Sequence, residues 1–146
     1  MNTHFTRTIG SSLTPEQAFQ VILDVPAWWS GYFNEHFEGE TKALNDVFSF
    51  TAGDGAHYSR QQLTELVPGV KIVWLVTDSR LSFLEKQDEW TGSRLVFDIS
   101  REGDRTMVRF THEGLTPEVE CYDNCTPAWA QYLQGKLLPL LNPPQA

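Results

Sequence analysis

Basic residues are scarce in this sequence, which has 11 Lys and Arg against 19 Asp and Glu and a formal net charge of -8 at pH 7. Nucleic-acid binding depends on clustered Lys and Arg for affinity to the phosphate backbone. The basic residues here are scattered, so we expect no nucleic-acid partner. No segment approaches the roughly 20 apolar residues of a membrane-spanning helix, so we also expect no membrane span.

The first ten residues lack the continuous apolar stretch of a secretory signal peptide, because polar and apolar residues alternate in them. We therefore expect a cytoplasmic protein. Cysteine is also rare, with only Cys121 and Cys125. A cytoplasmic location predicts that both thiols are reduced and free.

Metal and cofactor motifs are weak or missing. The two cysteines could place two zinc ligands on one helical face, with His112 nearby in the sequence. Pro127 predicts instead that Cys121 precedes the helix, and no third or fourth ligand is evident, so we expect no metal. We find no nucleophile motif and no glycine-rich phosphate loop. These absences predict no cofactor, assign no catalytic residue and favour a binding protein over an enzyme.

The chain does contain enough apolar residues for a core. It has 146 residues, of which 40% are hydrophobic, including five Trp and nine Phe. A chain of roughly 150 residues buries about 70% of its unfolded surface. No Gly/Ser-rich linker or internal repeat divides it, which predicts one domain over residues 1–146.

The first predicted helix has clear boundaries. Thr14 is a good N-cap, Pro15 fits the first helical position, and Gln17 can complete a capping box with Thr14. Pro26 should end this helix or restart it as a second short one.

Several segments alternate between apolar and polar residues and are separated by Gly and Pro, which predicts antiparallel strands joined by tight turns. One face of such a meander must be covered. The segment 28–37 is expected to be irregular. The predicted strands are 5–9, 46–51, 57–67, 71–77, 82–89, 95–100 and 106–111.

We expect a C-terminal helix to cover the apolar face of the predicted sheet. It should begin near Asp123 or Asn124, with either side chain as its cap, because Pro127 is tolerated in a first turn. Gly135 lowers its intrinsic stability, so packing must hold it. Its apolar stripe comprises Trp129, Tyr132, Leu133, Leu137 and Leu140.

Alternation with a period of two assigns the faces of the later strands. Polar residues such as Arg94, Asp98 and Arg109 should point away from the helix. The inward set is Ile72, Trp74, Val76, Leu95, Phe97, Ile99, Val108, Phe110 and His112.

Five segments in order carry a family resemblance: 27–29, 65–69, 89–93, 110–115 and 118–122. They read Ala-Trp-Trp, Glu-Leu-Val-Pro-Gly, Glu-Trp-Thr-Gly-Ser, Phe-Thr-His-Glu-Gly-Leu and Glu-Val-Glu-Cys-Tyr. With them the chain resembles the START-like superfamily, also called SRPBCC. The most similar branch is named for the activator of the heat-shock protein 90 ATPase.

The resemblance implies an α+β helix-grip fold, also called START-like or Bet v-like, in which a curved antiparallel sheet wraps around a long C-terminal helix. It also implies an apolar pocket between sheet and helix. The sequence alone equally supports a filled core. The superfamily contains ligand carriers, cyclases and chaperone partners, so the fold does not fix the activity.

We expect the interior to bind a small apolar or amphipathic molecule. His112 could orient a ligand or move a proton, or it could be a hydrogen-bonded residue that supports the turn at Gly114. Trp28, Trp29 and Trp90 could lie at a cavity mouth or support the core and its turns. The candidate ligand-binding residues are Trp74, Phe97, Phe110, His112, Trp129 and Tyr132.

Two other functions stay open. One is a polyketide cyclase or dehydratase-like enzyme, in which His112 and a nearby tyrosine act as acid or base. The other is a protein-interaction module that modulates a chaperone ATPase, as the branch name implies.

Overall fold

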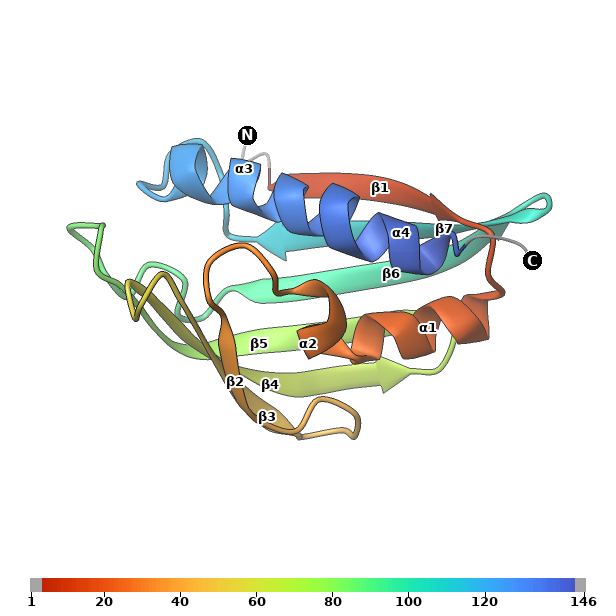
Figure 1. The fold of residues 1–146 in the computed structure, drawn as a ribbon, viewed down its shortest axis with the longest axis horizontal. Coiled ribbons are helices and arrows are strands. Elements are labelled where there is room, and N and C mark those ends of the chain that lie inside the picture. The colour runs from red at the N-terminus through yellow and green to blue at the C-terminus, as the bar shows by residue number, and fades with distance from the viewer. Residues whose placement is uncertain (1–3, 144–146) are drawn as a thin grey trace.

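Seven strands form one antiparallel sheet in the computed structural model, which describes residues 4–143, in the order β1-β7-β6-β5-β4-β3-β2 (Figure 1). The strands are β1 Phe5–Ser11, β2 His36–Gly39, β3 Val47–Ala52, β4 His57–Val67, β5 Lys71–Leu81, β6 Arg94–Glu102 and β7 Arg105–Glu113. The helical elements are α1 Pro15–Leu23, α2 Val25–Trp28, α3 Tyr122–Tyr132, the π-helical turn η1 Leu133–Leu137 and α4 Leu138–Leu141.

The helices lie on one side of the sheet, with the C-terminal helix along β1 and with α1 and α2 across the central strands (Figure 1). The expected α+β helix-grip fold, a curved antiparallel sheet with a C-terminal helix packed on it, is therefore confirmed. None of the described helices has the length and apolar character that crossing a bilayer requires.

The predicted start of α1 is confirmed in detail. The Thr14 hydroxyl accepts a hydrogen bond from the N–H of Gln17 at 3.2 Å, and the Gln17 side chain accepts one from the N–H of Thr14 at 3.0 Å. This reciprocal pair satisfies two donors that the helix itself leaves free. Pro26 restarts the chain as α2.

The predicted strand over 82–89 is wrong. Strand β5 extends to Leu81, and the residues after it form successive turns until β6 begins at Arg94. The Glu120 carboxylate accepts the N–H groups of Glu85 and Lys86, which would bond to a neighbouring strand in a sheet. The short edge strand β2 lies partly within the segment 28–37, which was expected to be irregular.

The C-terminal helix begins earlier than expected. Its first residue is Tyr122 and its N-cap position is Cys121, which makes no capping hydrogen bond through its side chain. Asp123 therefore lies inside the first turn rather than at the cap, while the Asn124 side chain lies outside the described part of the structure. Pro127 is accommodated inside the helix.

The glycine in this helix has a packing role. Gly135 lies in η1, where the Tyr32 hydroxyl approaches so closely that a Cβ atom at Gly135 would collide with it. The same hydroxyl donates to the carbonyl of Gln131 at 3.3 Å. The missing side chain thus lets the segment after α2 pack on the helix.

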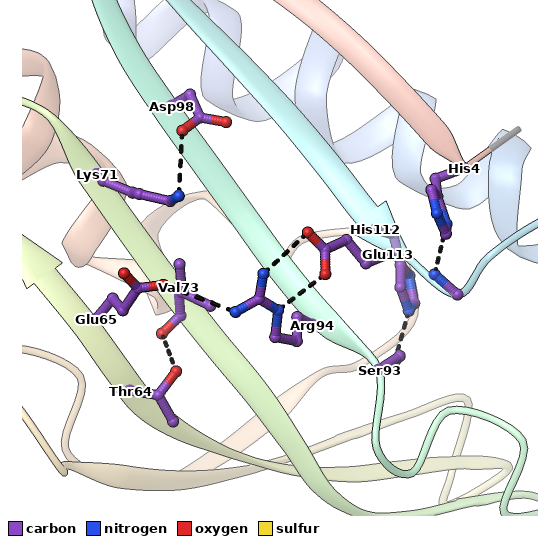
Figure 2. Close-up of polar contacts among 11 residues, drawn as sticks. His4, Thr64, Glu65, Lys71, Val73, Ser93, Arg94, Asp98, His112 and Glu113 are labelled. Carbon is purple, nitrogen blue, oxygen red and sulfur yellow. Dashed lines mark hydrogen bonds and ion pairs between the residues drawn. The ribbon is translucent and has the colours of Figure 1, made fainter.

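The strand faces follow the predicted alternation. The inward set from β5, β6 and β7 is buried, and its apolar members share one core cluster with Trp129, Leu133 and Leu137. Arg94 lies on the outer face, where it pairs with Glu113 at 2.8 Å and with Glu65 at 3.7 Å (Figure 2). These ion pairs are half-exposed, and such pairs contribute about 1 kcal/mol or less, so the register is determined mainly by the apolar face.

The prediction of two free thiols is not confirmed. The structure places the sulfur atoms of Cys121 and Cys125 in contact, with Cα atoms 5.5 Å apart, a separation that a disulfide can span. Cys121 has helical backbone angles, φ -70° and ψ -14°, so it shares a helical face with Cys125. Within residues 4–143, no group of three or more His, Cys, Asp or Glu side chains is arranged to hold a metal ion.

Candidate functional site

A cavity of about 230 Å³ lies between the C-terminal helix and one end of the sheet. Its walls come from α3, from the ends of β3 and β4, from the segment after α2 and from the loop between β5 and β6. The lining residues are Trp29, Phe33, Phe50, Ala52, Gly53, Ala56, His57, Phe83, Trp90, Cys125, Ala128, Trp129 and Tyr132.

A row of stacked aromatic rings forms the inner wall. Trp29 stacks on Phe50 with ring centroids 4.0 Å apart and on Trp129 with centroids 5.0 Å apart. Trp129 in turn lies parallel to Trp90, at 5.8 Å and an interplanar angle of 10°. These rings are almost fully buried. Because neighbouring rings fix one another, the wall is formed before any ligand enters.

The mouth of the cavity carries exposed aromatic side chains. Phe33 is 44% exposed and Phe83 is 49% exposed, although both line the cavity. Large apolar side chains that are exposed together mark binding surfaces more often than single ones do. The opening of the cavity is therefore flanked by apolar side chains, with Phe33 from the segment after α2 and Phe83 from the loop between β5 and β6.

Hydrogen bonds of Glu35 connect the segment after α2 to the C-terminal helix. Its carboxylate accepts the N–H groups of Gly31 at 2.9 Å, Tyr32 at 3.3 Å and Phe33 at 3.2 Å. It also accepts the Tyr132 hydroxyl at 2.5 Å. Burial opposes ionisation of Glu35, but these hydrogen bonds outweigh it and hold its pKa below the ordinary value. Burial and the adjacent carboxylate raise the pKa of Tyr132, so Tyr132 stays protonated and donating.

We expect Glu35→Ala to loosen this side of the cavity. The substitution leaves the Tyr132 hydroxyl and three N–H groups without their acceptor, which should cost about 1–3 kcal/mol of stability. Urea denaturation of Glu35→Ala beside Glu38→Ala, an exposed glutamate of β2, measures this difference. Equal stability of the two variants would contradict the role given to Glu35.

His57 is the polar side chain at the sheet end of the cavity. Its Nε2 lies 3.3 Å from the Ser59 hydroxyl, and its ring meets Trp90 edge-on at 4.6 Å and Phe50 at 5.1 Å. Burial lowers the pKa of His57 to about 4. The imidazole is therefore neutral at neutral pH.

His112 lies behind the wall rather than on it. Its Nδ1 accepts the indole N–H of Trp129 at 3.1 Å, and its Nε2 lies 2.9 Å from the Ser93 hydroxyl (Figure 2). Ser93 donates to the carbonyl of Trp90 at 2.6 Å, so Nε2–H of His112 must donate to Ser93. Burial and the charges of His57 and His4 lower the pKa of His112 to about 3. This chain ties Trp129 to Trp90, the two parallel rings of the wall.

The six predicted site residues occupy three different environments. Trp129 and Tyr132 line the cavity, and His112 contacts the back of its wall. The other three pack in the core outside it. These are Trp74, edge-on to Phe48 at 4.9 Å, Phe97, beside Phe110 at 5.0 Å, and Phe110, beside Trp129 at 4.7 Å.

Eleven lining residues were absent from the sequence-based site, among them Trp29, Phe50, His57 and Trp90. Trp29 and Trp90 were considered for a cavity mouth. Trp28, by contrast, is a core anchor that donates to the carbonyl of Ile22 at 3.0 Å. His57 begins a predicted strand, and the alternation of β4 could have placed it on the inner face.

No model of a known protein family matches the sequence, and no curated protein matches it. Solved structures do match. The Aha1 dimer from Colwellia psychrerythraea is 20% identical with a TM-score of 0.70, and the match covers 95% of this chain and 96% of that one. A protein from Chromobacterium violaceum is 18% identical with a TM-score of 0.65, covering 96% and 99%.

CalU16 from Micromonospora echinospora is 12% identical with a TM-score of 0.61, and the match covers 93% of this chain and 73% of that one. DynU16, a protein in the dynemicin biosynthetic locus, is 10% identical with the same TM-score and covers 93% and 46%. Sequence identities this low establish a similarity of fold only. The expected helix-grip fold is confirmed at that level: this chain shares its fold with the Aha1 protein from Colwellia psychrerythraea and with the protein from Chromobacterium violaceum.

Proposed function

We propose that this protein binds a small apolar or amphipathic molecule in the cavity between α3 and the sheet. The observation that carries the proposal is the preformed aromatic wall around about 230 Å³ of space. Small-molecule sites are usually concave and apolar, with a few polar groups that fix orientation. His57 and Tyr132 are the polar groups here.

The expected affinity for a ligand of this size is weak. A bicyclic aromatic ligand that loses about 200 Å² of apolar surface gains roughly 5 kcal/mol. Association itself has an opposing entropic cost, but a preformed wall reduces the part due to ordering of side chains. Because 5 kcal/mol alone corresponds to a dissociation constant of about 0.2 mM, we expect values of about 0.2 mM or weaker.

Two measurements test the proposal. Native mass spectrometry of freshly purified protein, beside a denatured control, should show a non-covalent adduct. Titration with fatty acids, flavonoids and polyketide-like aromatics, followed by tryptophan fluorescence, should show saturable binding, because three tryptophans of the wall, Trp29, Trp90 and Trp129, would sense the ligand.

We expect Ala128→Trp to weaken binding at least about tenfold, because Ala128 lines the cavity and a larger side chain would fill it. Gln131→Trp, at an exposed position of the same helix, is the matched control. If no compound binds the wild type, or if the two variants bind alike, the cavity is not a ligand site. The exposed Phe33 and Phe83 would then favour an interaction module instead.

A cyclase or dehydratase is the second candidate. It is favoured by the fold likeness to DynU16, a protein in a biosynthetic locus, and by a histidine that lines the cavity. In that function His57, rather than His112, would be the acid or base. Loss of product formation from a bound polyketide-like substrate in His57→Phe, with substrate still bound, would distinguish this enzyme from a carrier.

A further inference from the structure

A row of polar side chains runs along the inner face of β4, within a core that is mostly apolar. His57, Ser59 and Gln61 occupy alternate positions of the strand, so their side chains share one face. Ser59 and Gln61 are fully buried. Nε2 of Gln61 donates to the Ser59 hydroxyl at 2.7 Å, and that hydroxyl lies 3.3 Å from Nε2 of His57. The row thus ends at the cavity, where His57 is a lining residue.

The direction of this row determines the tautomer of His57. Because Oγ of Ser59 accepts from Gln61, its own proton is free to donate, and Nε2 of His57 is the acceptor within reach. A neutral imidazole that accepts at Nε2 carries its proton on Nδ1. Among the hydrogen bonds of residues 4–143, none engages this Nδ1–H.

The structure orients the Gln61 amide with its N–H toward Ser59. Its Oε1 is buried and has no hydrogen-bond partner. Gln61 pairs in register with Val76, two residues along the same face from Trp74, whose indole N–H is also buried without a partner.

We propose that Nδ1–H of His57 is a hydrogen-bond donor of the cavity, beside the unpartnered indole N–H of Trp90, and that the ligand is a flat, uncharged aromatic molecule with an acceptor atom on its edge. The assignment rests on the proposed binding function and specifies its ligand class. The stacked rings of the wall match an aromatic plane. The Glu35 carboxylate behind Tyr132 disfavours an anionic acceptor at the other end of the site.

Isosteric ligands separate this donor from simple apolar burial. Naphthalene, quinoline and isoquinoline have nearly the same size and shape, but the last two carry a ring nitrogen that accepts a hydrogen bond. We expect quinoline or isoquinoline to bind the wild type about two- to tenfold more tightly than naphthalene. His57→Phe should bring this ratio close to one, whereas His57→Asn, whose amide N–H lies near the position of Nδ1, should restore part of it.

Ser59→Ala provides a second variant, which leaves the imidazole ring of His57 in place. Without the hydroxyl, the tautomer of His57 is no longer fixed, so the affinity ratio should fall in this variant as well. Thermal denaturation of each variant confirms that it is folded before its ratio is used.

Imidazole ¹⁵N spectra test the tautomer without any ligand. His57 should be the Nδ1–H form and His112 the Nε2–H form, with signals assigned from His57→Phe. Two results would overturn the donor assignment in a cavity that still binds naphthalene. One is equal affinity of the wild type for naphthalene and for the two ring-nitrogen compounds, and the other is an Nε2–H form of His57. If none of the three compounds binds, the proposed function fails together with it.

Discussion

Replacing Trp129 by alanine is expected to lower the free energy of unfolding by about 3–5 kcal/mol, the usual cost of truncating a large buried aromatic side chain. Trp129 is 2% exposed. Its ring contacts Trp29, Phe110 and Trp90 at centroid distances of 5.0, 4.7 and 5.8 Å. The substitution therefore removes the centre of the cavity wall, and it should reduce ligand binding as well as stability.

Trp129→Phe separates packing from hydrogen bonding. A phenyl ring keeps much of the stacking but removes the indole N–H that Nδ1 of His112 accepts at 3.1 Å. A buried acceptor left without its donor should cost about 1–3 kcal/mol, less than the alanine substitution. Urea denaturation of both variants measures the two amounts. If Trp129→Phe is as stable as the wild type, the chain through His112 and Ser93 does not hold the wall in place.

Local patterns predicted most of the fold. The capping box at Thr14 and the turns at glycines are local features, so their signals lie in adjacent residues. The alternation of β5, β6 and β7 also predicted the buried face, because one face of a covered sheet must be apolar. The segment 82–89 was misassigned because its N–H groups bond within local turns, to Ala56 and, at Glu85 and Lys86, to Glu120, which lies about 35 residues away in the sequence.

The site was harder to predict than the fold. Alternation identifies which side chains point inward, but it does not tell which of them pack together and which leave space. Trp74, Phe97 and Phe110 all point inward, yet their neighbours fill the core around them. The cavity forms instead where β3, β4, the loop after β5 and α3 meet. That meeting depends on contacts between distant parts of the chain.

Histidine was the residue type for which sequence reasoning was least complete. His112 was considered because it ends an apolar strand, while His57 was overlooked because Ser59 and Gln61 follow it on the same face. The structure shows those two polar residues as hydrogen-bonded partners in the interior. An inward polar residue in an apolar sheet can therefore indicate a buried network as well as an exposed face.

Acidification is expected to destabilise the protein strongly between pH 6.5 and about pH 4. Both histidines have an ordinary pKa of 6.5, which desolvation lowers in the folded state to about 4 for the partly exposed His57 and to about 3 for the buried His112. In this interval the unfolded chain binds two protons that the folded chain does not. Stability therefore rises with pH, by up to about 2.7 kcal/mol per pH unit for the two groups together.

This contribution is fully present above pH 6.5 and is lost as the pH falls toward the folded pKa values of the histidines. From pH 6.5 to about pH 4 the total loss approaches about 7 kcal/mol, which is comparable with the whole stability of many domains. The lowered pKa values of Glu35 and Glu113 act at lower pH, because their ordinary value is 4.5. The histidines should therefore dominate the first phase of acid destabilisation.

Urea denaturation at a series of pH values tests this expectation. His57→Phe should reduce the slope of stability against pH to about half, or about 1.4 kcal/mol per pH unit, because one of the two differential protons is removed. His36→Gln, which changes an exposed histidine of β2, should leave the slope unchanged. A wild-type stability that stays constant from pH 6.5 to 4.5 would mean that the interior admits the charged imidazoles. The dry aromatic wall around His57 and the neutral chain through His112 would then both be contradicted.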